Sequence, residues 1–275
     1  MASIYTHNRF GKHVKHHFPK EWQKAIVQNE SLYLLGQQGP DLFFFYPKTL
    51  MKSDSPGTVI HKQAGKQFIN KQKDRLRALP LNHPQWSYFI GSLCHYILDV
   101  HIHPTVEAVK NDATGYSHIA VETELDRYYI EQDGMVGVAY RLDKLITKDD
   151  VTYEQHIPPF YTMYDKADQK TVMGGIRYFR LVKKWCFAKT PLREKIVAKL
   201  IKVIGNDTPN FNGLVMHLTP LPEAQQNQER LVSCVDKALE SAPTLIQNAI
   251  DFIREDVPLV DFFNYTYDGD YVNEQ

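Results

Sequence analysis

The sequence predicts an all-α protein, built as a bundle of many helices. Apolar residues recur mostly at helical spacing along the 275 residues, and runs that alternate with period two are scarce. The stretch from Trp86 to His103 is apolar on nearly every side, so we expect a buried helix there. Polar side chains interrupt this helix at regular intervals, which predicts a functional site between buried helices.

The composition is that of an ordinary soluble globular protein, with 43% hydrophobic and 23% charged residues. Its 32 basic and 32 acidic residues cancel, so no net positive field would draw the chain to nucleic acid. A balanced total charge does not exclude local basic patches, but we do not expect a dedicated DNA-binding protein. We treat residues 1–275 as a single α-helical domain, with the metal-site half at about 1–135 and a helical remainder at 136–275.

The start of the chain lacks a basic region followed by an apolar run, so we expect no signal peptide. No stretch approaches the roughly 20 apolar residues that a transmembrane helix needs. Cys94, Cys186 and Cys234 stand far apart in apolar stretches, a pattern typical of free thiols. These features together predict a cytoplasmic protein.

Helix signals and helix-breaking residues divide the chain. We expect helices over residues 7–17, 19–35, 59–79, 84–103, 117 to beyond 129, 168–188, 191–204 and 222–255. Because proline lacks a backbone N–H, we expect one helix to close at Pro104 and another to break at Pro243. Residues 53–58 and 111–117 are expected to be loops, and residues 144–159 to be irregular or to hold a short strand.

The buried helix carries a polar ridge. His95, Asp99 and His103 are each four residues apart, so on a helix they lie on one face, about 40° apart per step. A buried carboxylate costs several kcal/mol unless it is paired or binds a metal. Imidazole and carboxylate ligands on one face suit zinc. The alternative is a His–Asp pair that satisfies itself in the core, which is harder to sustain for three groups in register.

The positions of His101 and Gly91 relative to this ridge refine the prediction. His101 lies about 240° around the helix from His95, so we choose His103 as the ligand. Gly91 extends the ridge by one turn without a side chain and should leave room beside it.

The next helix repeats the spacing. His118 and Glu122 are four residues apart, and Asp126 follows four residues later on the same face. Asp126 could be a further ligand, an acceptor that orients a histidine, or the partner of Arg127, and spacing does not separate these roles.

Histidine is unevenly distributed. Of twelve histidines, only His156 and His217 lie beyond His118, and this concentration suggests metal ligation. His13, His16 and His17 fall in a basic stretch, and we expect them to be solvated.

Several motifs occur in a specific order in the first half of the chain. They are Tyr5-Thr6-His7, Gly39-Pro40-Asp41, a lone His61 before a helix, His95-x3-Asp99-x3-His103, and His118-x3-Glu122. On these motifs the sequence resembles the zinc-dependent phospholipase C family. That family includes a domain of glycosylphosphatidylinositol-specific phospholipase D and is distantly related to the S1/P1 nucleases. The resemblance implies a phospholipase C/P1 nuclease-like helical bundle; beyond about residue 135 only the helical character is similar.

The resemblance also implies the zinc ligands. Asp41, His61, His95 and Asp99 would surround one zinc, and His103, His118 and Glu122 would hold a second. His7 would hold a third, with Asp99 as a bridge. Asp41 could instead act as a general base.

The chain departs from the family at the third zinc. In the secreted phospholipases that ion is also bound by the processed amino terminus, whereas His7 lies six residues from the initiator methionine here. A third zinc must therefore find another ligand, bind more weakly or be absent. The spacing after Asp99 resembles the D-V-x-x-H form of the phospholipase D relative. We expect two zinc ions and leave the third open.

These residues predict a zinc-dependent hydrolase of phosphate esters, a phospholipase C-like phosphodiesterase that uses a zinc-activated water. One alternative is an S1/P1-like nuclease or nucleotidase, and another is a non-catalytic, metal-stabilised helical binding protein. The expected partner is a phosphate-ester small molecule or a lipid. The aromatic residues 43–46 could line a lipid-binding cleft or pack in the core. The sequence does not indicate an oligomeric state.

Overall fold

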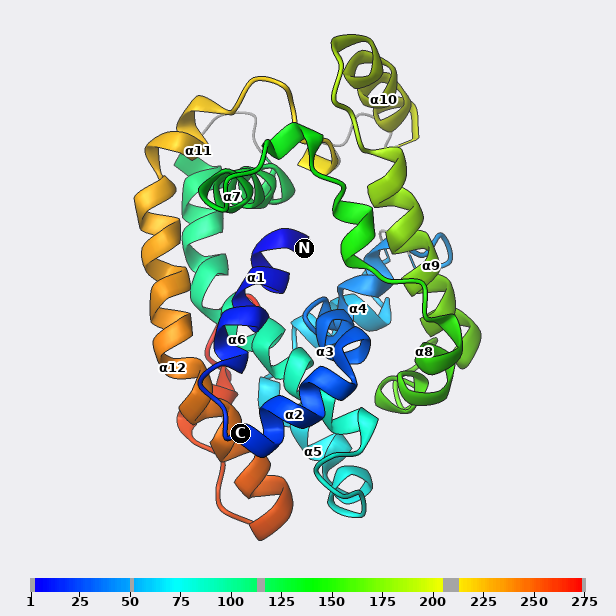
Figure 1. The fold of residues 1–275 in the computed structure, drawn as a ribbon, viewed down its shortest axis with the longest axis vertical. Coiled ribbons are helices and arrows are strands. Elements are labelled where there is room, and N and C mark those ends of the chain that lie inside the picture. Colours follow the sequence, from blue (N-terminus) through cyan, green and yellow to red (C-terminus); the bar gives the residue numbers. More distant parts are fainter. Residues whose placement is uncertain (1–2, 50–51, 113–116, 205–212, 274–275) are drawn as a thin grey trace.

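The computed structural model describes residues 3–49, 52–112, 117–204 and 213–273. Within these ranges the chain is helical and contains no strand, apart from one isolated bridge between Tyr265 and Tyr271. The predicted all-α, multi-helix fold is therefore confirmed (Figure 1). The α-helices are α1 (Ile4–Lys15), α2 (Lys20–Gln28), α3 (Glu30–Gly36), α4 (Pro56–His61), α5 (Gly65–Arg77), α6 (Pro84–Asp112), α7 (His118–Gln132), α8 (Asp150–His156), α9 (Gln169–Trp185), α10 (Pro191–Ile204), α11 (Pro222–Gln226) and α12 (Gln228–Glu255). The short 3₁₀ helices are η1 (Gly39–Phe45), η2 (Gly137–Ala139), η3 (Leu142–Leu145), η4 (Pro158–Phe160) and η6 (Asp261–Asn264).

Helix α6 is the central element of the bundle. Helices α3 and α12 pack along it, and α1 and α7 contact it as well (Figure 1). Tyr88, Phe89 and Cys94 point in three different directions around α6, roughly 100–140° apart, and all three side chains are inaccessible to solvent. Neighbouring helices thus cover α6 on all sides, which explains its nearly continuous apolar sequence.

The contact between α3 and α6 depends on two glycines. A Cβ atom at Gly91 would lie 2.2 Å from the carbonyl oxygen of Tyr33 and 3.0 Å from the Cα of Gly36. A Cβ at Gly36 would lie 2.4 Å from the carbonyl oxygen of Tyr88. The room expected beside Gly91 is therefore filled by the backbone of α3, which comes closer than any residue with a side chain would allow.

The expectation that the central helix closes at Pro104 is wrong. Helix α6 continues through Pro104 to Asp112. Val106 and Val109 beyond the proline are completely buried, so packing of the last turns outweighs the lost backbone hydrogen bond. The carboxyl-terminal segment also covers this point, because a Cβ at Gly269 would lie 2.5 Å from Cγ of Pro104.

The expected break at Pro243 is also wrong. Helix α12 runs without interruption through this proline, because Ala242, Leu245 and Ile246 around it are buried in the core. The interruption within residues 222–255 instead lies at Asn227, between α11 and α12.

Two further predicted helices are each divided. Residues 19–35 form α2 and α3, separated at Asn29, and residues 59–79 form α4 and α5. Since α4 already begins at Pro56, it includes part of the loop expected over residues 53–58. His61 is the last residue of α4 and precedes α5, which begins at Gly65.

The expectations for two other segments have different outcomes. Residues 144–159 hold α8 between η3 and η4, and they contain no strand. The loop expected at residues 111–117 falls mostly outside the described residues.

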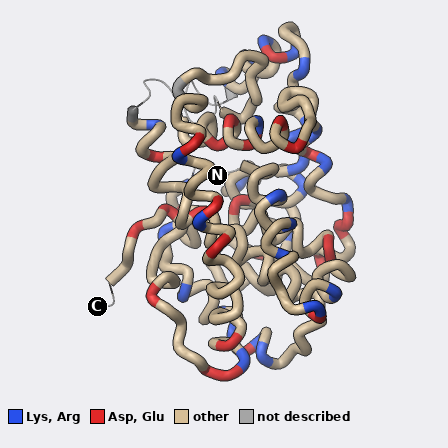
Figure 2. The backbone as a smooth tube through the Cα atoms, turned by 60° about the vertical axis from the view of Figure 1, so that its left-hand side comes forward, with Lys and Arg blue, Asp and Glu red and all other residues tan. Residues whose placement is uncertain are grey.

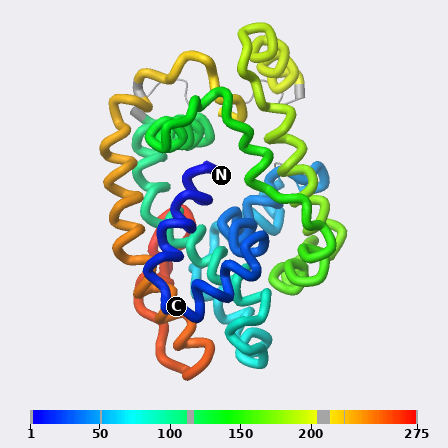
Figure 3. Tube along the Cα trace, in the orientation of Figure 1, coloured from blue at the N-terminus to red at the C-terminus, as the bar shows by residue number. Residues whose placement is uncertain are grey.

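Helix α1 begins near the middle of the molecule, and the carboxyl-terminal segment folds back from α12 onto the helices around α6 (Figure 3). The amide of Tyr267 donates a hydrogen bond to the carbonyl oxygen of His61, and the amide of Gly65 donates one to that of Tyr265. The segment after α12 is thereby attached to the helices that surround α6.

Charged residues of both signs are distributed over the fold (Figure 2). Among the described helices, none has both the length and the apolar character needed to cross a membrane. Cys94, Cys186 and Cys234 are free thiols, as predicted, and the first two are buried.

We predict that Gly91→Ala destabilises the protein. Alanine would favour the helix by about 1 kcal/mol, but a Cβ at 2.2 Å from a backbone oxygen forces α3 and α6 apart. Overpacking of this kind costs about 1–3 kcal/mol, so the net change should lower the free energy of unfolding in a urea titration. Lys24→Ala, on the exposed face of α2, is the control and should change it by less than about 0.5 kcal/mol. Equal stability of the two variants would contradict the close helix contact.

Candidate metal centre

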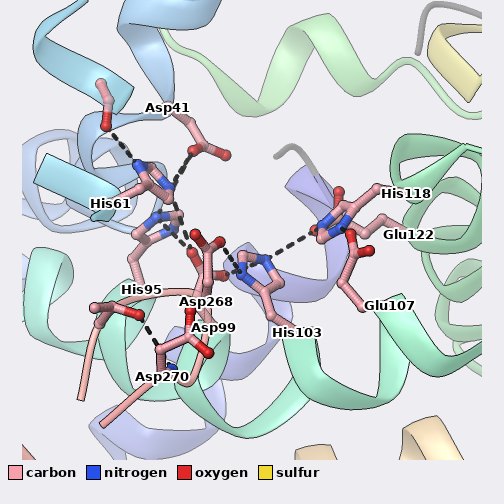
Figure 4. Close-up of polar contacts among 12 residues, drawn as sticks. Asp41, His61, His95, Asp99, His103, Glu107, His118, Glu122, Asp268 and Asp270 are labelled. Atoms are coloured by element: carbon pink, nitrogen blue, oxygen red, sulfur yellow. Dashed lines mark hydrogen bonds and ion pairs between the residues drawn. The ribbon is translucent and has the colours of Figure 1, made fainter. Parts of the chain in front are cut away.

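The polar ridge of α6 faces a set of histidines and carboxylates from four other elements (Figure 4). His95, Asp99 and His103 are each at most 2% exposed, on the same side of α6 as the spacing predicted. The other predicted residues are His7 on α1, Asp41 on η1, His61 on α4, and His118 and Glu122 on α7. The fold therefore brings together all eight residues that the sequence singled out.

Three groups within this set have the geometry of metal sites. The first is His7, His95 and Asp99, the second Asp41, His61 and His95, and the third His103, His118 and Glu122. In each group the candidate ligand atoms all lie within 4.8 Å of one another. His95 belongs to two groups, so these two cannot both use its single inward nitrogen at once.

Asp99 lies between the groups and presents one oxygen to each side. Its Oδ1 is 3.2 Å from Nε2 of His7 and 3.5 Å from Nε2 of His103. Its Oδ2 is 3.1 Å from Nε2 of His95 and 3.7 Å from Nε2 of His61. The Nε2 of His61 is also 3.1 Å from Oδ1 of Asp41. A carboxylate arranged in this way can serve two cations.

The separations fit ligands that share an ion. Zinc bonds of 2.0–2.1 Å at tetrahedral angles place neighbouring ligand atoms about 3.3 Å apart. The corresponding distances from Glu122 Oε1 to Nε2 of His103 and of His118 are both 3.5 Å. Several of the buried atoms make no hydrogen bond to the described residues: Nε2 of His7, His61, His95 and His103, Oδ1 of Asp41, and both carboxylate oxygens of Asp99. Since buried polar atoms are almost always satisfied, this donor set fits zinc.

Backbone carbonyls fix the orientation of two histidine rings. Nδ1 of His61 lies 2.8 Å from the carbonyl oxygen of Gly57, and Nδ1 of His95 lies 3.1 Å from that of Gln37. A carbonyl oxygen only accepts, so Nδ1 must carry the proton in both rings. The lone pair on Nε2 then points into the centre, where a metal ligand needs it.

Glu107 is part of the site and was missed by the sequence reasoning. Its Oε1 lies 2.6 Å from Nδ1 of His118, and this hydrogen bond lowers the pKa of Glu107 to about 2. Glu107 lies four residues after His103, so it continues the polar ridge by one turn. The signal was present in the sequence, but the helix was expected to end at Pro104.

Asp268 is a second missed residue. Its Oδ1 lies 3.6 Å from Nδ1 of His103, although 165 positions separate the two residues in sequence. Next to it, Tyr267 is buried with its ring 4.8 Å from that of His61. No local spacing could have indicated either contact, because both depend on the path of the carboxyl-terminal segment.

The Gly39-Pro40-Asp41 motif positions Asp41 by means of its glycine. Gly39 has a φ of +44°, which residues with a side chain rarely adopt. A Cβ there would also lie 2.3 Å from the ring of His95. The glycine thus lets η1 run against His95, and Asp41 enters the centre beside it.

Among the described residues, Asp126 belongs to none of the three metal-site groups and does not pair with Arg127. Arg127 instead forms an ion pair with Glu124. Asp126 accepts hydrogen bonds from the amides of Tyr5 and Thr6 and from the hydroxyl of Thr6, at 3.2, 2.8 and 2.8 Å. These amides belong to the first turn of α1, which has no side-chain cap of its own. Burial raises the pKa of Asp126 to about 6. Asp126 therefore holds the helix that carries His7.

The electrostatics of the centre favour cations. Burial alone would oppose ionisation of Asp99, but His103 and His95 hold its pKa well below the usual range. Asp41 behaves in the same way, with a pKa lowered to about 2 beside His61 and His95. Burial would also lower the pKa of His103, but Asp99, Asp268 and Glu122 raise it to about 10. Each of these shifts means that the buried carboxylates stabilise positive charge.

Lys183 on α9 is a buried lysine near the carboxylates of Asp126 and Glu122. Burial lowers the pKa of its ammonium group, against the opposing effect of Asp126 and Glu122. The sequence reasoning did not single it out, since a lysine in an amphipathic helix gives no signal of burial.

The remaining candidates lie away from the centre or in the core. His101 hydrogen-bonds through Nδ1 to the carbonyl oxygen of Ile97 and faces away from the ridge, as predicted. Phe43 and Phe45 are core residues, whereas Phe44 is half-buried with its ring 5.1 Å from that of His61. His13, His16 and His17 are exposed, as expected.

Comparisons with known proteins agree with this geometry. The family model described as zinc-dependent phospholipase C matches residues 6–171, a range that contains all eight predicted metal-site residues. No curated protein and no solved structure matches the chain. Since the family model covers more than half of the 275 residues, the chain belongs to the zinc-dependent phospholipase C family.

We predict that His103→Ala removes bound zinc and that His101→Ala does not. The two histidines are two residues apart on α6, but only His103 lies within reach of Glu122 and Asp99. Metal analysis of the purified variants should show fewer zinc ions per chain for His103→Ala than for the unaltered protein. His101→Ala is the matched control for loss of an imidazole from the same helix. Equal zinc content in both variants would contradict the assignment of His103.

Proposed function

We propose that this member of the zinc-dependent phospholipase C family is a zinc-dependent hydrolase that cleaves phosphate esters. The observation that carries the proposal is the position of Asp99 between two sets of histidines. Its Oδ1 faces His7 and His103, and its Oδ2 faces His61 and His95. Such an arrangement supports two cations a few ångströms apart, and such pairs catalyse displacement at phosphorus.

The proposed ligand sets follow the geometry. Asp41, His61, His95 and Asp99 would hold one zinc, and His103, His118 and Glu122 a second. His7 would hold a third ion with Asp99, in competition with the first set for His95. When bound, zinc would polarise the phosphoryl group and lower the pKa of water to about 7.

The residues of the chain have distinct tasks in this proposal. The pKa of Asp41 is lowered to about 2, so its carboxylate is ionised and is available either as a zinc ligand or as the acceptor of the proton of the attacking water. Asp99 and the histidines would hold the ions, and the carbonyl oxygens of Gln37 and Gly57 keep His95 and His61 in the ligating tautomer. The buried α6 and its neighbours exclude bulk water, which strengthens these interactions.

Substrate would enter from the side of α7 and the carboxyl-terminal segment. The side chains of Asp268 and Glu107 are 50% and 43% exposed, and that of His118 is 19% exposed. By contrast, Asp41 and His95 are at most 2% exposed on the opposite side. The proposed substrate class is a phosphodiester, and the family favours a phospholipid headgroup.

A nucleotide is the alternative substrate, because Phe44 beside His61 could stack on a base. The balance of 32 basic and 32 acidic residues gives no support to a long nucleic acid. A panel of phosphatidylcholine, phosphatidylinositol, single-stranded DNA and a nucleoside monophosphate would identify the class.

The proposal is tested by metal analysis together with turnover of bis-p-nitrophenyl phosphate. Zinc-loaded protein should hydrolyse this ester, and chelation should abolish the activity until zinc is restored. Protein that binds zinc but turns over neither this ester nor any phosphodiester of the panel would favour a binding protein. Protein that folds and never binds zinc would refute the proposal.

We predict that Asp99→Ala loses both zinc and turnover, because its carboxylate faces both sets of histidines. Asp41→Asn should lower kcat by about 10²–10⁴-fold, the usual contribution of a general base. Zinc content separates the two roles of Asp41. A variant that keeps its zinc but loses kcat identifies a base, and one that loses zinc identifies a ligand. Asp99→Ala with unchanged zinc content and activity would contradict the proposed site.

A further inference from the structure

A different feature lies at one end of the long axis of the molecule. Helix α10 projects there from the rest of the bundle (Figure 1). Four of its apolar side chains are exposed: Leu192 by 71%, Ile196 by 44%, Leu200 by 44% and Val203 by 73%. Residues three and four apart share one face of a helix, so these four form a continuous apolar stripe. Large exposed apolar surfaces on soluble proteins usually mark an interaction site.

Another face of α10 is packed. Val197 is 4% exposed and joins a small separate core with Cys186, Ala188 and Val215. Ile201, four residues later on the same face, packs against this core. The helix is therefore attached through one face, while the described parts of the chain leave the apolar stripe exposed.

Basic residues surround the stripe. Residues 184–203 contain six basic side chains and one acidic side chain, whereas the whole chain has 32 of each. The six are Lys184, Lys189, Arg193, Lys195, Lys199 and Lys202. The one carboxylate, Glu194, accepts a hydrogen bond from His217 at 2.7 Å. Lys195 and Lys199 are exposed and follow one edge of the stripe, and Arg193 follows the other.

A hollow next to the start of α10 has the same charge. It has a volume of about 310 Å³ and is lined by Arg141, Lys184, Phe187, Lys189, Thr190 and Arg193. Arg141 pairs with Asp143 at 2.6 Å, so Lys184, Lys189 and Arg193 give the hollow its positive charge. Trp185 at the end of α9 is 54% exposed, and the guanidinium of Arg193 lies 5.8 Å from the centre of its ring. Basic hollows bind phosphate groups of anionic lipids, and tryptophan favours the membrane–water interface.

We propose that α10 and the end of α9 form a docking surface for a membrane that contains anionic phospholipids. The apolar stripe enters the boundary between headgroups and acyl chains, and the lysines and the basic hollow contact lipid phosphates. A lipid surface offers apolar and anionic partners at the same time, which matches the stripe and the basic residues beside it. A second copy of the chain would bring the same basic residues together, and nucleic acid would leave the stripe uncovered. The proposal does not depend on hydrolytic activity.

The test is sedimentation of the full chain with vesicles of phosphatidylcholine, with and without phosphatidylserine. Binding should require phosphatidylserine and weaken as salt is added. Lys195→Glu with Lys199→Glu should weaken binding at least about tenfold, since it replaces two attractive charges by two repulsive ones. Leu192→Ala with Leu200→Ala should weaken it at least about fivefold, because both side chains lose apolar area while alanine preserves the helix.

The matched control is Lys20→Glu with Lys24→Glu, an exposed pair on α2 with the same spacing and the same change of charge. It should bind vesicles like the unaltered protein. Circular dichroism and turnover of the water-soluble ester should be equal for all three variants if the fold is intact. Failure of hydrolysis in every sample would refute the proposed function and leave vesicle binding as an independent result.

Three outcomes would overturn the docking surface. One is equal binding with and without phosphatidylserine. Another is loss of binding on charge reversal but not on loss of the leucines, which would indicate a soluble polyanion. The third is a dimer in analytical ultracentrifugation that only the leucine variant disrupts, which would assign the stripe to a second copy of the chain.

Discussion

The structure depends on one buried carboxylate. Asp99 is 1% exposed in the middle of the central helix, and within the described residues each of its ion pairs is with a histidine. A carboxylate in such surroundings is costly unless cations compensate its charge. The histidines that compensate this charge lie on α1, α4 and α6. The position of the helix or of the ring is fixed in each case by a different hydrogen-bonded contact. Asp126 holds the start of α1, the carbonyl of Gly57 orients the ring on α4, and that of Gln37 orients the ring of His95.

The site could be predicted from sequence to the extent that its spacing is local. His95, Asp99 and His103 share a helical face, and only the period of the α-helix is needed to bring them together. The choice between His103 and His101 follows from the same geometry. Glu107 would have followed too, but the rule that proline ends a helix concealed it. That rule failed at Pro104 because buried valines on the next turns outweigh one lost hydrogen bond.

Other features could not have been predicted from the sequence, since they arise from contacts between distant segments. Asp268 reaches His103 only because the chain returns after α12, and Asp126 meets the start of α1 across 120 residues. Pairing of His61 with Asp41 and of His7 with Asp99 was implied by family resemblance, and spacing alone would not have given it. The family match ends at residue 171, so α10 and the carboxyl-terminal segment lie outside it. These are the parts in which this chain can differ from its relatives.

The most direct measurement is the anomalous diffraction signal at the zinc absorption edge, from crystals of protein purified with zinc. The account predicts one peak enclosed by Asp41, His61, His95 and Asp99, and another enclosed by His103, His118 and Glu122. Occupation of His7 would appear as a third peak on the other side of Asp99. Absence of any peak along the ridge of α6, with zinc confined to surface histidines such as His16, would contradict it.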